Sequence, residues 1–184
     1  MAVLTFANQL TLVRLLLIPA FVILTIYQYL GWALATFVFA GVTDLLDGLI
    51  ARWSNSRTNV GAWLDPAADK LLLLTAFVVL TLPGLGLTNP LPIWLTVVVF
   101  SRDIGIVVTV AVVNMAVGPR TFRPSMLGKA ATGVYVVTGI VTMTFNYWER
   151  TSALINVCVY ASLGIALISG LHYIVHAARS VDST

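Results

Sequence analysis

The feature that most limits the fold of this chain is a series of long apolar runs separated by short polar breaks. A helix needs about 20 apolar residues to cross the hydrocarbon core of a bilayer, and the breaks divide the chain into six runs of about that length. The chain has 184 residues, of which 59% are hydrophobic and only 9% are charged, far from the composition of a soluble domain. The sequence therefore predicts an all-α, multi-pass membrane protein that forms a single domain over residues 1–184. The six predicted transmembrane helices are 10–29, 31–53, 61–82, 91–115, 126–146 and 152–176.

Four of the seven acidic residues lie within 26 positions, between strongly apolar stretches. They form two pairs, Asp44 with Asp47 and Asp65 with Asp69, which we call the aspartate cluster. On helices these i,i+3 and i,i+4 spacings point each pair from one face. A cage of carboxylate oxygens suits a hard cation such as Mg²⁺ or Mn²⁺ and leaves coordination positions for phosphate oxygens. We therefore expect the cluster to bind a metal.

Residues beside the first pair fit a phosphate-containing ligand. Gly48 and Ala51 remove side-chain bulk, and Arg52 supplies a forked donor for a phosphate. The alternative interpretation is that the carboxylates form structural ion pairs inside a helical bundle. Too few bases lie nearby to pair all four, and acids within a membrane are usually functional, which favours a ligand site.

The spacing from Asp44 to Asp69, D-x-x-D-G-x-x-A-R, eight residues, then G-x-x-x-D-x-x-x-D, resembles the signature of the CDP-alcohol phosphatidyltransferases. The resemblance implies an enzyme in which an alcohol attacks the β-phosphorus of a CDP-linked lipid and CMP leaves. By resemblance, the aspartate cluster holds the metal, Asp69 also takes the proton of the acceptor hydroxyl, and Arg52 binds the diphosphate. The small residues that would leave room for the nucleotide are Gly48, Ala51 and Gly61. Members of the family are commonly homodimers, so a homodimer is expected.

The basic residues predict which side of the membrane carries the active site, because cytoplasmic loops are enriched in lysine and arginine. If there are six spans, one side carries most of the bases and the other carries only Arg150 beside Glu149. The bases on the first side are Arg52, Arg57, Arg120, Arg123, Lys129 and Arg179. That side is expected to be cytoplasmic and to hold both termini and the aspartate cluster. Since the net charge of +3 is spread over the ends of spans, a nucleic-acid partner is not expected.

Other basic residues are candidates for binding the acceptor or its phosphate. Arg102 lies beside Asp103 well inside the fourth span, where the pair is either a local charge pair or a ligand site with Arg102 facing the cavity. Arg123 and Lys129 lie at the cytoplasmic entrance to the fifth span and are predicted anion ligands. Near the N-terminus, Arg14 ends an N-x-L-T-x-x-R stretch similar to one found in the family. That stretch is either part of the active-site wall or an interfacial anchor with Arg14 snorkelling.

The acceptor alcohol is inferred from resemblance within the superfamily. Phosphatidylglycerophosphate synthases, which use glycerol 3-phosphate, often carry a second arginine seven residues after the acid of an Arg-Glu pair. Here the pair is Arg102-Asp103 and the later position is Val110, so one base for a free phosphate is missing. The stretches that look closer to cardiolipin synthases are Leu91–Thr96, Ser101–Asp103, and Arg123-Pro124 followed by Gly128–Thr132. A diester acceptor carries less charge, so phosphatidylglycerol is the expected acceptor and glycerol 3-phosphate the alternative.

A divalent-cation transporter is the alternative from a different functional class, because it too can place aspartates on facing helices at membrane depth. A transporter is expected to carry acids or broken helices along its whole path. Here the aspartate cluster lies at one end of the spans and the outer halves are apolar. The fixed glycine and Ala-Arg positions also have no role in ion passage, so the enzyme is favoured.

Overall fold

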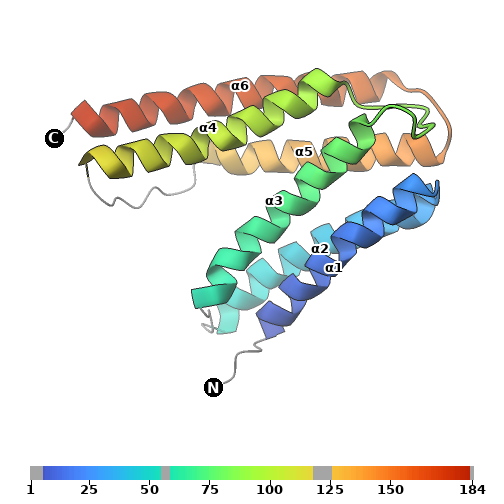
Figure 1. Ribbon diagram of the computed structural model, residues 1–184, viewed down its shortest axis with the longest axis horizontal. Coiled ribbons are helices and arrows are strands. Elements are labelled where there is room, and N and C mark those ends of the chain that lie inside the picture. Colours follow the sequence, from blue (N-terminus) through green and yellow to red (C-terminus); the bar gives the residue numbers. More distant parts are fainter. Residues whose placement is uncertain (1–5, 55–58, 118–125, 183–184) are drawn as a thin grey trace. The chain divides into compact units, whose positions relative to one another are not determined.

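The computed structural model describes residues 6–54, 59–117 and 126–182. Within them, the side chains of 6–11, 44–54, 59–69, 114, 116–117 and 176–182 are outside the described part. The described residues form six helices and no strand, as the sequence predicts (Figure 1). The helices are α1 Phe6–Ile26, α2 Leu30–Ser54, α3 Asn59–Thr81, α4 Ile93–Val117, α5 Met126–Tyr147 and α6 Ala153–Asp182.

The helices group into two compact units. Unit 1 consists of Met1–Pro90 and Gly139–Thr151 and therefore contains α1, α2, α3 and the last part of α5. Unit 2 consists of Leu91–Thr138 and Ser152–Thr184, with α4, α6 and the first part of α5.

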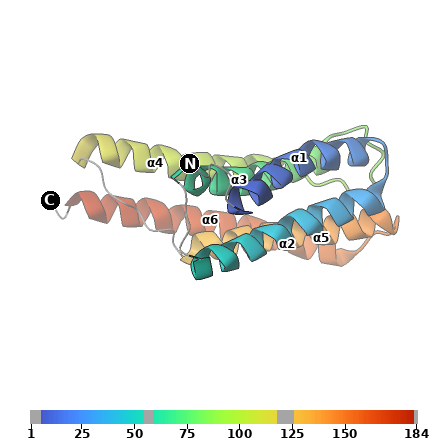
Figure 2. The same cartoon turned by 90° about the horizontal axis from the view of Figure 1, so that it is seen from below.

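In unit 1, α1 packs against both α2 and α3, which touch each other over a smaller region. Figure 2 shows α1 alongside α3. Phe21 of α1 and Phe37 of α2 are buried, with ring centroids 5.8 Å apart. Gly139 of α5 permits the same core to close, because a Cβ at this position would lie 3.1 Å from Cζ of Phe37. Aromatic rings and small residues thus form the centre of this unit.

One end of unit 1 is tied together by polar side chains. The loop between α3 and α4 has left-handed φ values at Gly84 (+89°) and Gly86 (+64°), which glycine adopts without strain. At the end of this loop, the backbone N–H of Asn89 donates to Oδ1 of Asn146 at 2.8 Å, and Nδ2 of Asn146 donates to the Asn89 carbonyl at 3.1 Å. Nδ2 of Asn89 also donates to the Arg150 carbonyl at 2.9 Å. We call these three contacts the asparagine clasp; it fixes the loop to the end of α5.

In unit 2, α4 packs along α6 (Figure 1). Leu95 and Val99 of α4 and Val159 and Ala166 of α6 are buried in this unit. A polar contact joins α5 to α6, with Oγ1 of Thr138 and Oγ of buried Ser162 2.8 Å apart. These two hydroxyl groups are therefore hydrogen-bonded within the protein, as a lipid environment favours.

Three helices in the described part are long and apolar enough to cross a bilayer: Ile93–Val113, Met126–Tyr147 and Ala153–Val175. Shorter apolar helices cover Leu12–Ile26, Leu30–Thr43 and Lys70–Thr81. Outward-facing apolar side chains such as Leu16 (71% exposed) and Leu171 (65% exposed) are of the kind that contact lipid. Together these features are those of a membrane protein.

Candidate functional site

The aspartate cluster lies on continuous helix, although its side chains are outside the described part. Asp44 and Asp47 are in α2, and Asp65 and Asp69 are in α3, so both pairs have the helical spacing that the sequence predicts. Four residues connect the end of α2 at Ser54 to the start of α3 at Asn59. At 1.5 Å per residue, the inner members of the pairs are roughly 10 Å and 9 Å from these ends, and the outer members are both roughly 15 Å away. The two pairs thus lie at similar distances along their helices from the end of α2 and the start of α3.

The other residues predicted to bind the CDP-lipid also have side chains outside the described part. Gly48, Ala51 and Arg52 lie in the last part of α2, and Gly61 lies near the start of α3, all with undescribed side chains. Arg123 is outside the described residues altogether. Among the side chains that are described, no group of three or more metal-binding residues lies together. The metal site and these contacts therefore remain predictions.

The donor set of the aspartate cluster fits a hard divalent cation. The segment from Asp44 to Asp69 contains no histidine or cysteine, so the cluster can offer only oxygen ligands from its carboxylates. These donors come from two helices of one compact unit, both packed against α1. Mg²⁺ or Mn²⁺ would match this chemistry, whereas Zn²⁺ prefers nitrogen and sulfur.

Among the described side chains, Arg14 of α1 is the largest that is fully buried, with 1% of its surface exposed. A snorkelling arginine keeps its charged head in water, so the interfacial-anchor interpretation is wrong for this residue. A buried guanidinium is tolerated only with hydrogen-bonding or anionic partners. Arg14 belongs to the unit that carries the aspartate cluster, which leaves the active-site wall as the better interpretation.

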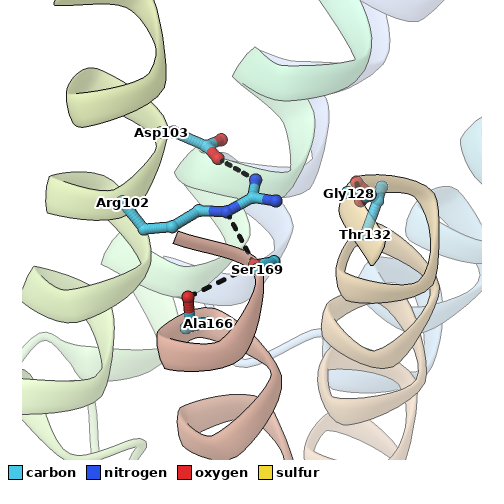
Figure 3. Close-up of polar contacts among 6 residues, drawn as sticks. All are labelled: Arg102, Asp103, Gly128, Thr132, Ala166 and Ser169. Carbon is cyan, nitrogen blue, oxygen red and sulfur yellow. Dashed lines mark hydrogen bonds and ion pairs between the residues drawn. The ribbon is translucent and has the colours of Figure 1, made fainter. Parts of the chain in front are cut away.

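Arg102 and Asp103 form an ion pair at the middle of the α4 span. Nη1 of Arg102 donates to Oδ1 of Asp103 at 2.6 Å, and the two side chains are 9% and 17% exposed. Nε of Arg102 donates to Oγ of Ser169 on α6 at 3.0 Å (Figure 3). The Nη2 group has no partner among the described residues. The pair is therefore a local charge pair that still leaves one end of the guanidinium for an anion.

Three residues around Arg102 were not predicted from the sequence. Ser169 is 1% exposed and its hydroxyl also donates to the Ala166 carbonyl at 3.2 Å. Tyr135 of α5 is 1% exposed, and its hydroxyl group interacts electrostatically with both Arg102 and Asp103. Gly170 lies beside the stem of the arginine, since a Cβ there would be 3.6 Å from Cγ of Arg102. A lone hydroxyl in an apolar run gives no periodic signal, so only the intramembrane arginine hinted that such partners exist.

Two other sequence predictions can be placed in unit 2. Lys129 at the start of α5 is exposed, and nearby Thr132 is exposed and donates to the Gly128 carbonyl at 3.3 Å (Figure 3). No contact of Lys129 with an anion site is described, so its role remains a prediction. Val110 lies two helical turns after Asp103, on the side of α4 that carries buried Val99 and Val113, and is half-buried. Position 110 thus belongs to the packed side of α4.

Comparison with known proteins identifies the family. The CDP-alcohol phosphatidyltransferase profile matches residues 4–171. A probable phosphatidylglycerophosphate synthase of Mycobacterium tuberculosis is 32% identical over 185 residues, which cover 95% of this chain and 82% of that protein. A cardiolipin synthase (CMP-forming) of Streptomyces coelicolor is 34% identical over 97% of this chain and 85% of its own length. The human cardiolipin synthase (CMP-forming) is 32% identical over 92% of this chain and 61% of its own length.

The family profile covers most of the chain. The two bacterial relatives, both named as synthases, are similar to this chain over nearly its whole length. This agreement favours the enzyme over the cation transporter. The chain is an enzyme of the CDP-alcohol phosphatidyltransferase family.

Proposed function

We propose that this enzyme transfers the phosphatidyl group of CDP-diacylglycerol to phosphatidylglycerol, which gives cardiolipin and CMP. The observation that carries the choice of acceptor is the Arg102–Asp103 pair. Arg102 is the only base of α4, and Asp103 already offsets its charge at 2.6 Å. A phosphate monoester carries about −1.5 to −2 charges at pH 7 and would meet the Asp103 carboxylate with no second cation on α4. A phosphodiester carries one negative charge, which the open Nη2 group of Arg102 can bind.

The proposed chemistry uses residues of α2 and α3 for the transfer itself. The aspartate cluster would hold Mg²⁺ or Mn²⁺, which when bound neutralises phosphate charge during the displacement. Asp69, as the least tightly coordinated carboxylate, would accept the proton of the attacking hydroxyl. The hydroxyl oxygen bonds to the β-phosphorus as the bond to the CMP oxygen breaks. Arg52 would bind the diphosphate, and Gly48, Ala51 and Gly61 would leave space for the nucleotide.

The acceptor site is proposed to lie around Arg102, with Arg123 and Lys129 as further anion ligands. The contact with Ser169 supports this role for Arg102, because it holds the guanidinium in one orientation at mid-span. Buried Arg14 is proposed to belong to the wall of the site in unit 1. We treat the chain as one catalytic domain over residues 1–184.

We further propose that all six helices span the membrane, with the aspartate cluster on the cytoplasmic side. Three of them have the length and composition of spans in their described parts, and the other three carry shorter apolar stretches. The distribution of bases supports the orientation, because only Arg150 lies at the opposite end of the predicted spans. The homodimer expected from the family resemblance stays a prediction.

Glycerol 3-phosphate is the second candidate acceptor, in which case the product is phosphatidylglycerophosphate. The probable phosphatidylglycerophosphate synthase of Mycobacterium tuberculosis favours it, since the similarity covers 95% of this chain. The two acceptors are separated by supplying purified enzyme with CDP-diacylglycerol, Mg²⁺ or Mn²⁺, and one acceptor at a time. Mass spectrometry then identifies the lipid product. Efficient synthesis of phosphatidylglycerophosphate without any cardiolipin would show that our choice of acceptor is wrong.

A further inference from the structure

A cavity of about 610 Å³ lies in unit 1, at the turn between α1 and α2 and the end of α5. The lining residues that matter for its chemistry are Gln28, Tyr29, Gly31, Trp32, Tyr147 and Glu149. The aspartate cluster begins 14 residues after the first residue of α2, which is roughly 20 Å along the helix. The cavity is therefore separate from the proposed catalytic site.

Two residues of this cavity have a backbone conformation that favours glycine. Gln28 (φ 63°) and Glu149 (φ 53°) are the non-glycine residues with left-handed φ in the described part of the chain. Each follows a helix: Tyr29 N–H donates to the Leu24 carbonyl at 2.8 Å, and Arg150 N–H donates to the Phe145 carbonyl at 3.0 Å. At such helix ends glycine is the usual residue, since a Cβ costs roughly 1–2 kcal/mol there. Because a side chain at these two positions costs stability, we expect the side chains of Gln28 and Glu149 to have a function that offsets the cost.

The side chain of Gln28 makes a hydrogen bond that explains its presence, whereas the side chain of Glu149 makes none in the described structure. The Gln28 amide donates to the Leu85 carbonyl and so ties the α1–α2 turn to the loop after α3. The Glu149 carboxylate is exposed and has no hydrogen bond or ion pair in the described structure, not even with its neighbour Arg150. It is thus an open negative charge at the edge of the cavity.

Aromatic rings accompany this charge. Tyr29, Trp32 and Tyr147 line the cavity and are 60%, 70% and 54% exposed. Gly31 lets the Tyr147 ring lie against the start of α2, because a Cβ there would be 2.8 Å from Cε2 of that ring. Aromatic faces attract cations, and a nearby carboxylate adds to the attraction. The combination selects an organic ammonium group.

We propose that this cavity binds the ammonium headgroup of a bilayer lipid. Its position favours a lipid over a dissolved amine, because Tyr147 is the last residue of the candidate span Met126–Tyr147. The cavity is therefore at the height where lipid headgroups meet the ends of spans. Exposed apolar side chains beside it, Ile26 and Tyr27, would lie against the lipid.

The test measures which lipid the full-length protein retains. The protein is placed in nanodiscs that contain phosphatidylethanolamine and a neutral diacyl glycolipid, which has no ammonium group and is not a proposed substrate, and native mass spectrometry counts the lipids that stay bound after release. The wild type is expected to retain phosphatidylethanolamine in preference. Glu149→Gln keeps the shape but removes the charge, and it should lower this preference roughly two- to fivefold, as for an exposed charge contact. Trp32→Leu should lower it by a similar factor through the lost cation–π contact.

The matched control is Arg150→Gln, which changes a neighbouring exposed charge outside the cavity lining and should leave the preference unchanged. Tetramethylammonium should displace the retained phosphatidylethanolamine. Equal retention of the two lipids, or an equal loss in the Arg150 and Glu149 variants, would overturn the proposal. If tetramethylammonium binds to the cavity but phosphatidylethanolamine is not retained, the ligand is a soluble amine and the lipid assignment is wrong.

Discussion

Replacing Ser169 with alanine tests whether Arg102 binds the acceptor. The change removes the hydroxyl that accepts from Nε of Arg102 at 3.0 Å, while the 2.6 Å pair with Asp103 stays. Hydrogen bonds to charged groups contribute about 1.5–3 kcal/mol, and part of this will be recovered by the remaining partner. We expect the guanidinium to lose its orientation and the KM for phosphatidylglycerol to rise about tenfold, equivalent to about 1.4 kcal/mol. The kcat should change little, because the contact acts equally in the ground state and the transition state.

The assay is the initial rate of CMP release in mixed micelles, with each substrate varied in turn. The KM for CDP-diacylglycerol should be unaffected, since Arg102 is assigned to the acceptor. Ser162→Ala is the matched control: this serine is also fully buried on α6, but its partner is Thr138 and not Arg102. Both variants should lose about 1 kcal/mol of stability, measured as a similar drop in Tm. An equal rise in acceptor KM in both variants, or none in the Ser169 variant, would refute the assignment of Arg102.

The other predictions concern the metal and the acceptor. Asp44→Asn, Asp47→Asn or Asp65→Asn should each lower turnover more than about 100-fold. Even the loss of a residue that only hydrogen-bonds to a metal ligand lowers activity or metal affinity about 10–100-fold. The fold should be retained, so normal specific activity in poorly expressed protein would indicate a structural role instead. EDTA should abolish activity and Mg²⁺ or Mn²⁺ should restore it; full activity without metal would contradict the mechanism. Val110→Arg should raise the use of glycerol 3-phosphate relative to phosphatidylglycerol, because it supplies the missing base for a free phosphate on the packed side of α4. An unchanged product ratio would show that position 110 does not contact the acceptor.

The helices could be predicted from sequence because lipid makes their pattern simple. The predicted range 31–53 corresponds to α2 at Leu30–Ser54, and 126–146 to α5 at Met126–Tyr147. Apolar residues make up most of each helix, and the loop from Pro83 to Pro90 breaks the pattern with glycine and proline. The largest error is at the last helix, which continues to Asp182, because its final turns carry His176, Arg179 and Asp182 and so do not have the composition of a span. The fixed spacing of the aspartate cluster likewise follows from helical periodicity alone.

Contacts between helices could not be predicted in the same way. Ser169, Tyr135 and the asparagine clasp each depend on which residues of different helices come together, and sequence periodicity does not encode this register. The burial of Arg14 could not be predicted from the sequence either. An arginine near the start of a span is equally compatible with the interface and with the interior, and only its 1% exposure decides between them.

The asparagine clasp also determines how the sidedness of this protein can be mapped. A reporter domain inserted between Leu85 and Asn89 would separate two anchored points, one held by Gln28 and the other by Asn146. Loss of its signal would then report damage to unit 1 as readily as the wrong compartment. A single cysteine at exposed Thr88 leaves both anchors in place and can be labelled from either side with a membrane-impermeant thiol reagent. The native Cys158 is half-buried in α6, so replacing it with serine would give such labelling a clean background.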